Sequence, residues 1–328
     1  MIVTFTANPS LDRTVSLAEP LRTGEVQHAL GAREDAGGKG INVARVLAAA
    51  GAETLAVLPL DPGDPFGALL TNAGVAHHGV PLAGVVRANL TIADADGVTT
   101  KLNLPGTVRT DADAAAITAA VVEAAAGATW LVLAGSLAPG LPDGFYVEVI
   151  RAVRSRWGTA SPAIAVDTSG PALAAVVADG RPDLIKPNDD ELASLVGAAL
   201  DTSLPLPEAV LAVARRLVPT RVGAALVTLG ADGAVLVTAD GAWHGTPPPT
   251  RVRSTVGAGD SSLAGYLLAA IAGETPADAL RSGIRYGSAA AALDGTVAPT
   301  PEDLPTGDVP VVPLETPNTT TTTGGHRD

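Results

Sequence analysis

Short apolar segments alternate with amphipathic or alanine-rich segments along most of the chain, and this alternation limits the possible folds more than any other feature. The apolar segments predicted to be strands are residues 2–6, 54–60, 130–134, 163–167, 183–186 and 224–229. The segments predicted to be helices are residues 41–50, 65–72, 111–126, 145–156, 190–196, 208–217 and 261–272. Strands that are apolar on both faces and separated by helices form a parallel sheet covered on both sides. The pattern therefore predicts an α/β protein with a mostly parallel central sheet between two helical layers.

Two segments in the N-terminal third, residues 13–33 and 85–104, interrupt this alternation. Their polarity changes roughly from residue to residue, and the second contains the turn signal Asp96-Gly97. We interpret them as exposed antiparallel strands that form one small β-sheet lid over the main domain. Residues 1–309 are then expected to form a single domain with this lid, and the Pro/Thr-rich residues 310–328 a disordered tail.

Charge and composition exclude several classes of function. The net charge of −13 argues against nucleic acid or an anionic membrane surface as the main partner. The absence of cysteine excludes disulfides, thiolate zinc sites and cysteine nucleophiles. No apolar run approaches the ~20 residues of a membrane span, and the N-terminal residues do not resemble a secretion signal. We therefore expect an acidic globular protein of the cytoplasm.

Lysine is rare in this chain, which makes its positions informative. Only 3 of the 21 basic residues are lysines, namely Lys39, Lys101 and Lys186. Each lies in a segment marked by Gly, Asn or Pro instead of on a charged helix face. A binding role for at least two of them is favoured over a chance distribution.

The segment RSTVGAGDSSLAGY, residues 253–266, carries the strongest signal for chemistry. Gly257, Ala258 and Gly259 directly precede Asp260, where a helical stretch begins. Backbone N–H groups at such a helix start, unobstructed by side chains, form an anion hole for a phosphoryl group. Asp260 could accept the proton of an attacking hydroxyl and also cap the helix. Capping alone would not require the small residues before it, so catalysis is the favoured interpretation.

A second glycine-rich segment, DAGGKGINVA, occupies residues 35–44. Gly37 and Gly38 precede Lys39 at the start of a predicted helix, with Asn42 in its first turn, so a ligand could approach the backbone closely. The alternative is a flexible turn that only connects the lid to the helix. Asp12 follows the first strand, at the edge of an open α/β sheet where ligands bind.

STVGAGD at 254–260 and AGGKGINVA at 36–44 resemble the C-terminal and N-terminal signatures of the PfkB/ribokinase family of carbohydrate kinases. The resemblance covers about residues 1–300. It implies a ribokinase-like three-layer fold, a nucleoside triphosphate donor, and a sugar acceptor covered by the lid. By motif, Asp260 matches the family's catalytic base and residues 257–259 its anion hole.

Three further segments resemble the nucleotide side of that family's site. KPNDDE at 186–191 is similar to an N-x-x-E element in which Asn188 and Glu191 organise Mg²⁺, although these two residues could instead form a helix capping box. TLGADG at 228–233 resembles a nucleotide-contacting turn, and residues 287–293 a helix beside the adenine. The resemblance thus implies ATP and Mg²⁺ as cofactors, with nucleotide-binding residues Lys186, Asn188, Thr228, Gly230, Gly233 and Ser288.

The lid adds positive charge that suits an anionic acceptor. Arg87 and Lys101 lie on predicted neighbouring strands, so together with Lys39 up to three cations would surround one pocket. Ser136, after the strand at 130–134, could add a hydroxyl or backbone contact to the same phosphate. An ordinary solvated lid face is the alternative.

The segments NPSLDRTV, LNLPG, DTSG and DLIKPN resemble the corresponding segments in the branch of the family that phosphorylates sugar phosphates. That resemblance implies transfer from ATP to the 6-hydroxyl of fructose 1-phosphate, giving fructose 1,6-bisphosphate and ADP. Tagatose 6-phosphate and fructose 6-phosphate stay open as acceptors, and a catalytically silent sugar-phosphate-binding protein is disfavoured. A homodimer through the lid is expected, because exposed strands leave edges that a second subunit can cover. The acceptor-binding residues implied are Asp12, Gly37, Gly38, Lys39, Asn42, Arg87, Lys101, Asn103 and Ser136.

Overall fold

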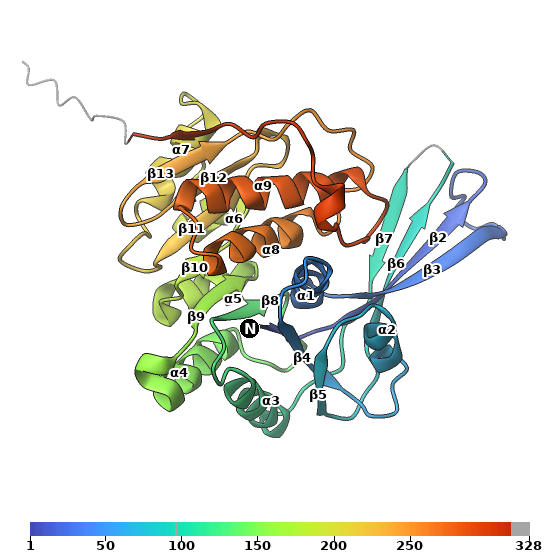
Figure 1. Cartoon of the computed structure of the whole chain (residues 1–328). Coiled ribbons are helices and arrows are strands. Elements are labelled where there is room, and N and C mark those ends of the chain that lie inside the picture. Colours follow the sequence, from blue (N-terminus) through green and yellow to red (C-terminus); the bar gives the residue numbers. More distant parts are fainter. Residues whose placement is uncertain (96–97, 316–328) are drawn as a thin grey trace, which may run out of the picture.

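A single large sheet runs through the centre of the molecule (Figure 1), in a computed structural model that describes residues 1–95 and 98–315. Its ten strands lie in the order β14 (Val311–Pro313), β13 (Ala242–Gly245), β12 (Ala234–Val237), β11 (Ala224–Thr228), β10 (Leu184–Ile185), β9 (Ala163–Asp167), β8 (Trp130–Ala134), β1 (Ile2–Thr6), β4 (Thr54–Leu60) and β5 (His77–Pro81). Neighbours from β5 to β11 are parallel, and β12 to β14 extend the sheet antiparallel. The predicted mostly parallel sheet is confirmed.

Helices cover both faces of this sheet because successive strand residues point to opposite sides. In β8, Val132 packs in the core beneath one helical layer, whereas Leu131 and Leu133 pack beneath the other. The first layer contains α1 (Lys39–Ala49), α8 (Ala258–Ile271) and α9 (Pro276–Ala292). The second contains α3 (Asp111–Ala124), α4 (Phe145–Trp157), α5 (Gly170–Ala175), α6 (Asp189–Val196) and α7 (Leu206–Ala214), while the short α2 (Phe66–Asn72) lies near β3 and β5.

A second, four-stranded sheet projects from the body beside α1 and α2 (Figure 1) and is called the lid below. Its strands lie in the order β3 (Ala29–Gly37), β2 (Ser10–Leu17), β6 (Arg87–Ala93) and β7 (Thr99–Asn103). The prediction of antiparallel strands is correct for β2–β3 and β6–β7 but wrong for β2–β6, which are parallel. Both β2 and β6 leave the body after a strand of the central sheet, so they enter the lid in the same direction. The predicted turn Asp96-Gly97 lies outside the described residues.

The C-terminal residues were predicted to lack regular structure from residue 310 onward, and this boundary is wrong. Val311–Pro313 form the edge strand β14, in which Pro313 pairs with Trp243 of β13. Backbone hydrogen bonds to an open sheet edge need no apolar period, so the polarity pattern did not reveal the strand. Residues 316–328 lie outside the described part of the chain. Among the helices that are described, none combines the length and apolarity needed to cross a membrane.

Candidate active site

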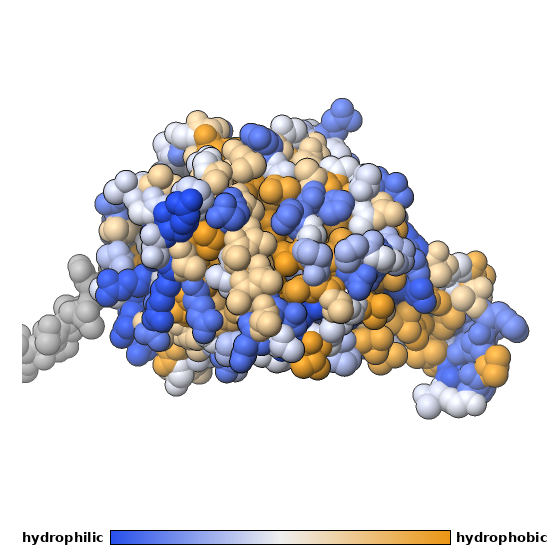
Figure 2. Space-filling view, turned by 90° about the horizontal axis from the view of Figure 1, so that it is seen from below, coloured by the Kyte–Doolittle hydropathy of each residue, from blue (hydrophilic) through white to orange (hydrophobic). Residues whose placement is uncertain are grey.

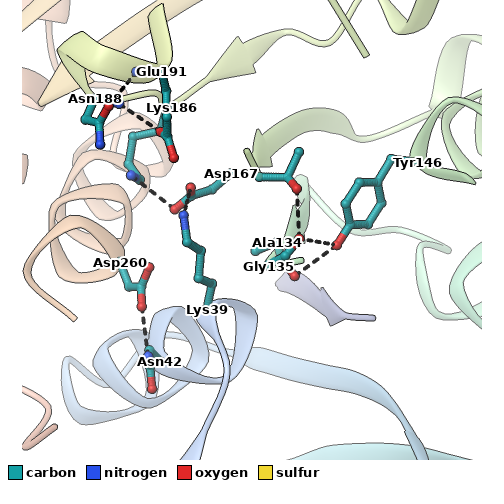
Figure 3. Close-up of polar contacts among 11 residues, drawn as sticks. Lys39, Asn42, Ala134, Gly135, Tyr146, Asp167, Lys186, Asn188, Glu191 and Asp260 are labelled. Carbon is teal, nitrogen blue, oxygen red and sulfur yellow. Dashed lines mark hydrogen bonds and ion pairs between the residues drawn. The ribbon is translucent and has the colours of Figure 1, made fainter. Parts of the chain in front are cut away.

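The carboxyl ends of the parallel strands meet at one edge of the central sheet, and the polar residues of the sequence motifs gather there (Figure 3). Asp167 ends β9, and Lys186 follows β10. Helices α1 and α8 begin at the same edge, so Lys39 and Asp260 in their first turns approach the strand ends. This is the edge at which open α/β sheets bind ligands.

Asp167 connects the two lysines of the body. Its side chain is fully buried, with one oxygen 2.7 Å from Lys39 Nζ and the other 3.1 Å from Lys186 Nζ. Burial raises the pKa of Asp167, but the two ammonium groups outweigh burial and hold it below its ordinary value. Burial lowers the pKa of Lys39, but the negative charges of Asp167 and Asp260 raise it by a larger amount. The pKa therefore lies above its ordinary value, and the lysine stays charged. The sequence analysis missed Asp167, although an acidic residue that directly ends the apolar strand AIAVD was a usable signal.

Asp260 lies at the start of α8, and its carboxylate accepts a hydrogen bond from Asn42 Nδ2 of α1 at 2.8 Å. The residue is only 6% exposed. Burial and the nearby Asp167 raise the pKa of Asp260 to about 6, against the opposing effect of Lys39 and Lys186. The expectation that Asp260 also caps its helix is wrong: the N-cap is Gly257, and no side chain caps α8.

Glycine is required where the first turn of α8 meets the lysines. Gly257 has a φ of +76°, which a side chain rarely tolerates. A Cβ added at Gly259 would lie 3.1 Å from Lys186 Nζ, so this ammonium group sits directly against the backbone of the helix start. The first N–H groups of a helix have no partner within the helix and carry its positive dipole end. Positive charge and free N–H groups therefore converge beside Asp260.

A cleft of about 750 Å³ opens on the other side of the α8 N-terminus. The structure brings most of the residues expected to bind nucleotide onto its walls. These residues are Asn188, Thr228, Gly230, Gly233 and Ser288, whereas the expected nucleotide-binding residue Lys186 is not part of the wall. Ala258 and Gly259 of the expected anion hole also line the cleft. The remaining wall is largely apolar, from residues 247–250, Val252 and Ile284. A ligand with a flat ring could pack the ring against this wall while its negatively charged end reaches Lys186 and the start of α8.

Asn188 and Glu191 form the capping box of α6 that was considered beside the metal role. Asn188 Oδ1 accepts from the Glu191 N–H at 2.7 Å, and Glu191 Oε2 accepts from the Asn188 N–H at 3.0 Å. Among the described residues, no group of three or more His, Asp or Glu could hold a metal ion alone. The cap leaves Glu191 Oε1 available, and a single carboxylate with substrate phosphates and water suits Mg²⁺. The residues thus fit an ion held mainly by a bound nucleotide.

The lid turns one polar face toward α1. Asp12, Asn89 and Asn103 pair across three adjacent strands, so their side chains share this face. Asp12 Oδ1 accepts hydrogen bonds from Ser10 Oγ at 2.8 Å and Asn89 Nδ2 at 2.9 Å, and burial raises the pKa of Asp12. A Cβ at Gly37 would lie 2.1 Å from Asp12 Oδ2, which explains the glycine there. Asn89 is a candidate that the sequence analysis left out.

The two lid cations are not adjacent, although the sequence analysis expected them to lie around one pocket. Arg87 pairs with Ser10, whereas Lys101 pairs with Thr91, four residues along β6 from Arg87. At about 3.3 Å per residue this separates the two positions by about 13 Å along the strand. Arg87 is half-buried near Asp12 and donates to the Leu104 carbonyl at 3.3 Å, while Lys101 is exposed. The structure therefore groups Arg87, not Lys101, with the residues near α1.

Ser136 follows β8 and lies beside the start of α1. A Cβ added to the preceding Gly135 would be 3.9 Å from Lys39 Cβ, which places the Gly135–Ser136 turn against that lysine. Gly38, the N-cap of α1, has a φ of +114° and packs against Thr6. The expected acceptor-side residues at and just before the start of α1 thus contact the lid at Asp12, the turn after β8 at Gly135, and Asp260 through Asn42.

Comparison with known proteins gives a consistent result. The family model described as "pfkB family carbohydrate kinase" matches residues 6–303. A 1-phosphofructokinase of Rhodobacter capsulatus is 37% identical over 308 residues, 92% of this chain and 94% of that protein. The ATP-dependent 6-phosphofructokinase isozyme 2 of Escherichia coli is 31% identical over 299 residues, covering 90% of this chain and 94% of the relative.

The structural comparison agrees with the sequence comparison. The crystal structure of phosphofructokinase-2 from Escherichia coli in complex with potassium superposes with a TM-score of 0.84 at 30% identity, covering 92% of this chain and 96% of that one. The expected ribokinase-like architecture, a central sheet between helices with a small β-sheet lid, is confirmed. The chain belongs to the pfkB family of carbohydrate kinases and is a transferase that phosphorylates an alcohol group.

Proposed function

We propose that this kinase transfers the terminal phosphoryl group of ATP to the 6-hydroxyl of fructose 1-phosphate, giving fructose 1,6-bisphosphate and ADP. The observation that carries the proposal is the position of Asp260, between the acceptor-side residues of α1 and the cleft beside α8. The 37% identity to a 1-phosphofructokinase along nearly the whole chain supports this acceptor.

In this proposal Asp260 is the general base. Its pKa of about 6 leaves it mostly ionised at neutral pH yet more basic than an exposed carboxylate, so it can take the proton of the attacking hydroxyl. Lys39 and Lys186, held by Asp167, would offset the negative charge that accumulates on the transferring group. The N–H groups of residues 257–259 would add hydrogen bonds to the same oxygens.

The nucleotide would occupy the 750 Å³ cleft, with its base against the apolar wall and Ser288. Thr228, Gly230 and Gly233 would contact its middle part, and the terminal phosphate would reach Lys186. Asn188 and Glu191 would hold Mg²⁺, which offsets the charge of the donor phosphates in an acidic protein.

The acceptor would lie beneath the polar face of the lid. Asp12, Gly38 and Asn42 would bind its hydroxyl groups, with Asn89 holding Asp12 in place. Its phosphate would meet Lys39, Arg87 and Ser136. Acceptor contacts are also proposed for Gly37, which lies against Asp12, and for Asn103, which shares the lid face of Asp12. Lys101 lies about 13 Å along β6 from the position of Arg87, so its proposed contact would require the lid to move toward the body.

Fructose 6-phosphate is the second candidate acceptor, because the chain is also 31% identical to an ATP-dependent 6-phosphofructokinase. Tagatose 6-phosphate belongs to the same group of candidates. The test is release of ADP from Mg-ATP with fructose 1-phosphate, fructose 6-phosphate, tagatose 6-phosphate, fructose and ribose. The highest kcat/KM with fructose 1-phosphate supports the proposal, and preference for any other sugar contradicts it.

We also propose a homodimer formed through the lid. The lid face opposite Asp12 carries Leu11, Val15, Leu90, Ile92 and Leu102, the last of them 51% exposed. Figure 2 shows hydrophobic residues gathered at the side where the lid joins the body. A second copy of the chain would cover this face. We further propose that the enzyme works in the cytoplasm, where ATP is available.

A further inference from the structure

The carbonyl oxygen of Gly135, at the carboxyl end of β8, is held from two sides. It accepts one hydrogen bond from the Tyr146 hydroxyl of α4 at 2.9 Å and another from Thr168 Oγ1 at 2.9 Å (Figure 3). The Tyr146 hydroxyl also lies 3.1 Å from the Ala134 carbonyl oxygen. The Gly135 N–H in turn donates to the Asp167 carbonyl at 2.9 Å. Both lone pairs of one carbonyl are thus occupied by buried hydroxyl groups.

A held carbonyl fixes the group on the other side of the same peptide. In a trans peptide the C=O of Gly135 and the N–H of Ser136 point in opposite directions. With the carbonyl directed toward Tyr146 and Thr168, the Ser136 N–H is directed away from the protein interior. Neither this N–H nor the Ser136 hydroxyl has a hydrogen-bond partner within the described part of the chain.

The Gly135–Ser136 turn lies beside the start of α1. The Gly135 turn faces Lys39, with an added Cβ at 3.9 Å from Lys39 Cβ, and its φ of +93° requires glycine. Lys39 Nζ is held by Asp167, the residue before Thr168. One segment, residues 167–168, therefore contacts both the Lys39 ammonium group and the carbonyl of the peptide that precedes Ser136.

We propose that Tyr146 and Thr168 are positioning residues, which aim the Ser136 N–H at the phosphate of the acceptor sugar. This inference rests on the proposed function, because it assumes a phosphorylated acceptor beside Lys39. Neither hydroxyl touches the acceptor: each acts through the Gly135 carbonyl. Burial and Asp167 raise the pKa of Tyr146, so its hydroxyl remains a donor at every working pH.

The variants Tyr146→Phe and Thr168→Val, alone and combined, remove the two donors with little change in packing. The Tyr146 ring keeps its contacts with Phe5 and Phe145 at centroid distances of 6.3 Å, so the aromatic cluster survives the loss of the hydroxyl. Thr168→Ser restores a donor, and Tyr266→Phe is the matched control on α8, away from this turn. Thermal unfolding of every variant identifies any that do not fold.

The measurement compares a phosphorylated acceptor with the same sugar lacking its phosphate. For the double variant we expect KM for fructose 1-phosphate to rise about tenfold, the effect of losing about one well-placed hydrogen bond to a charged group. KM for ATP and kcat/KM for free fructose should change less than twofold, and Thr168→Ser should behave as wild type. An unchanged KM for fructose 1-phosphate, or an equal loss with fructose, overturns the inference.

Failure of the proposed function gives a different result. If the unmodified enzyme prefers another sugar phosphate, the same comparison is made with that acceptor and its unphosphorylated form. A wild-type enzyme whose kcat/KM is the same with and without the phosphate overturns both the acceptor assignment and the positioning role. A selective effect on a 6-phosphate acceptor overturns only the choice of fructose 1-phosphate.

Discussion

Replacing Asp260 with asparagine should remove activity and stabilise the fold, because the carboxylate is charged in a place that disfavours charge. Its pKa rises from 3.8 to about 6 through burial and the nearby Asp167. At about 1.4 kcal/mol per pKa unit, this corresponds to a penalty of about 3 kcal/mol on the folded state at neutral pH. Asparagine has nearly the same shape and can still accept from Asn42. The attraction to Lys39 and Lys186 is already contained in this raised pKa, so we expect about 1 to 3 kcal/mol of added stability.

The pH dependence tests the cause of that gain. The folded-state pKa of this acid is raised, so the destabilisation is complete above about pH 6 and vanishes below pH 3.8. The stability difference between Asp260→Asn and wild type should therefore be roughly halved at pH 5 compared with pH 7.5. Urea unfolding at both pH values measures it, with Asp240→Asn, in an exposed turn, as the control.

Activity of the same variant supplies the second readout. Loss of the general base should lower kcat at least ~100-fold while the affinity for the sugar phosphate changes little. A variant less stable than wild type at pH 7.5, or a stability gain independent of pH, refutes the electrostatic reasoning. A near-normal kcat excludes Asp260 as the base.

Four further outcomes are expected. The kcat/KM of the wild type should fall about tenfold per pH unit below pH 6 as Asp260 becomes protonated, and a profile flat between pH 5 and 8 would contradict this. Asp167→Asn should move that acid limb to lower pH, because Asp167 raises the pKa of Asp260, and a limb that does not move argues against this coupling. The same variant should reduce kcat about tenfold or more, because Lys39 and Lys186 lose their common partner. Arg87→Ala should raise KM for the sugar phosphate several-fold more than Lys101→Ala, and the reverse order would show that the lid closes much further than its register suggests. Leu90→Lys on the apolar lid face should convert a dimer into monomers in sedimentation velocity, and an unchanged sedimentation coefficient excludes this interface.

Local sequence patterns were sufficient to predict most of the parallel strands, most of the helices and the main motifs. The strand and helix alternation predicts the layered parallel sheet because each apolar segment can be buried only between helices. Glycines at 257 and 259 beside Asp260 mark a helix start open to an anion, and the structure places Lys186 Nζ against that backbone. The rarity of lysine drew attention to Lys39 and Lys186, and the structure places both of them at one carboxylate.

Pairings across the sheet could not be read from these patterns. Strand register decides that Lys101 lies opposite Thr91, because a shift of two residues changes the neighbour without changing the polarity pattern. Residues Val311–Pro313 form a strand only because β13 offers an open edge. In both cases backbone hydrogen bonds, which carry no sequence signal, determine the arrangement.

The sequence by itself determined the fold class and the motifs from which the site is proposed, because both depend on neighbours a few positions apart. The tertiary structure alone decided which of the residues in those motifs lie together. Asn42 meets Asp260 across 218 positions of sequence, and Lys39 meets Asp167 across 128. Such contacts follow from the order of the strands and the points at which α1 and α8 begin. The same order buries Asp260, raises its pKa and brings the Tyr146 and Thr168 hydroxyls to the Gly135 carbonyl.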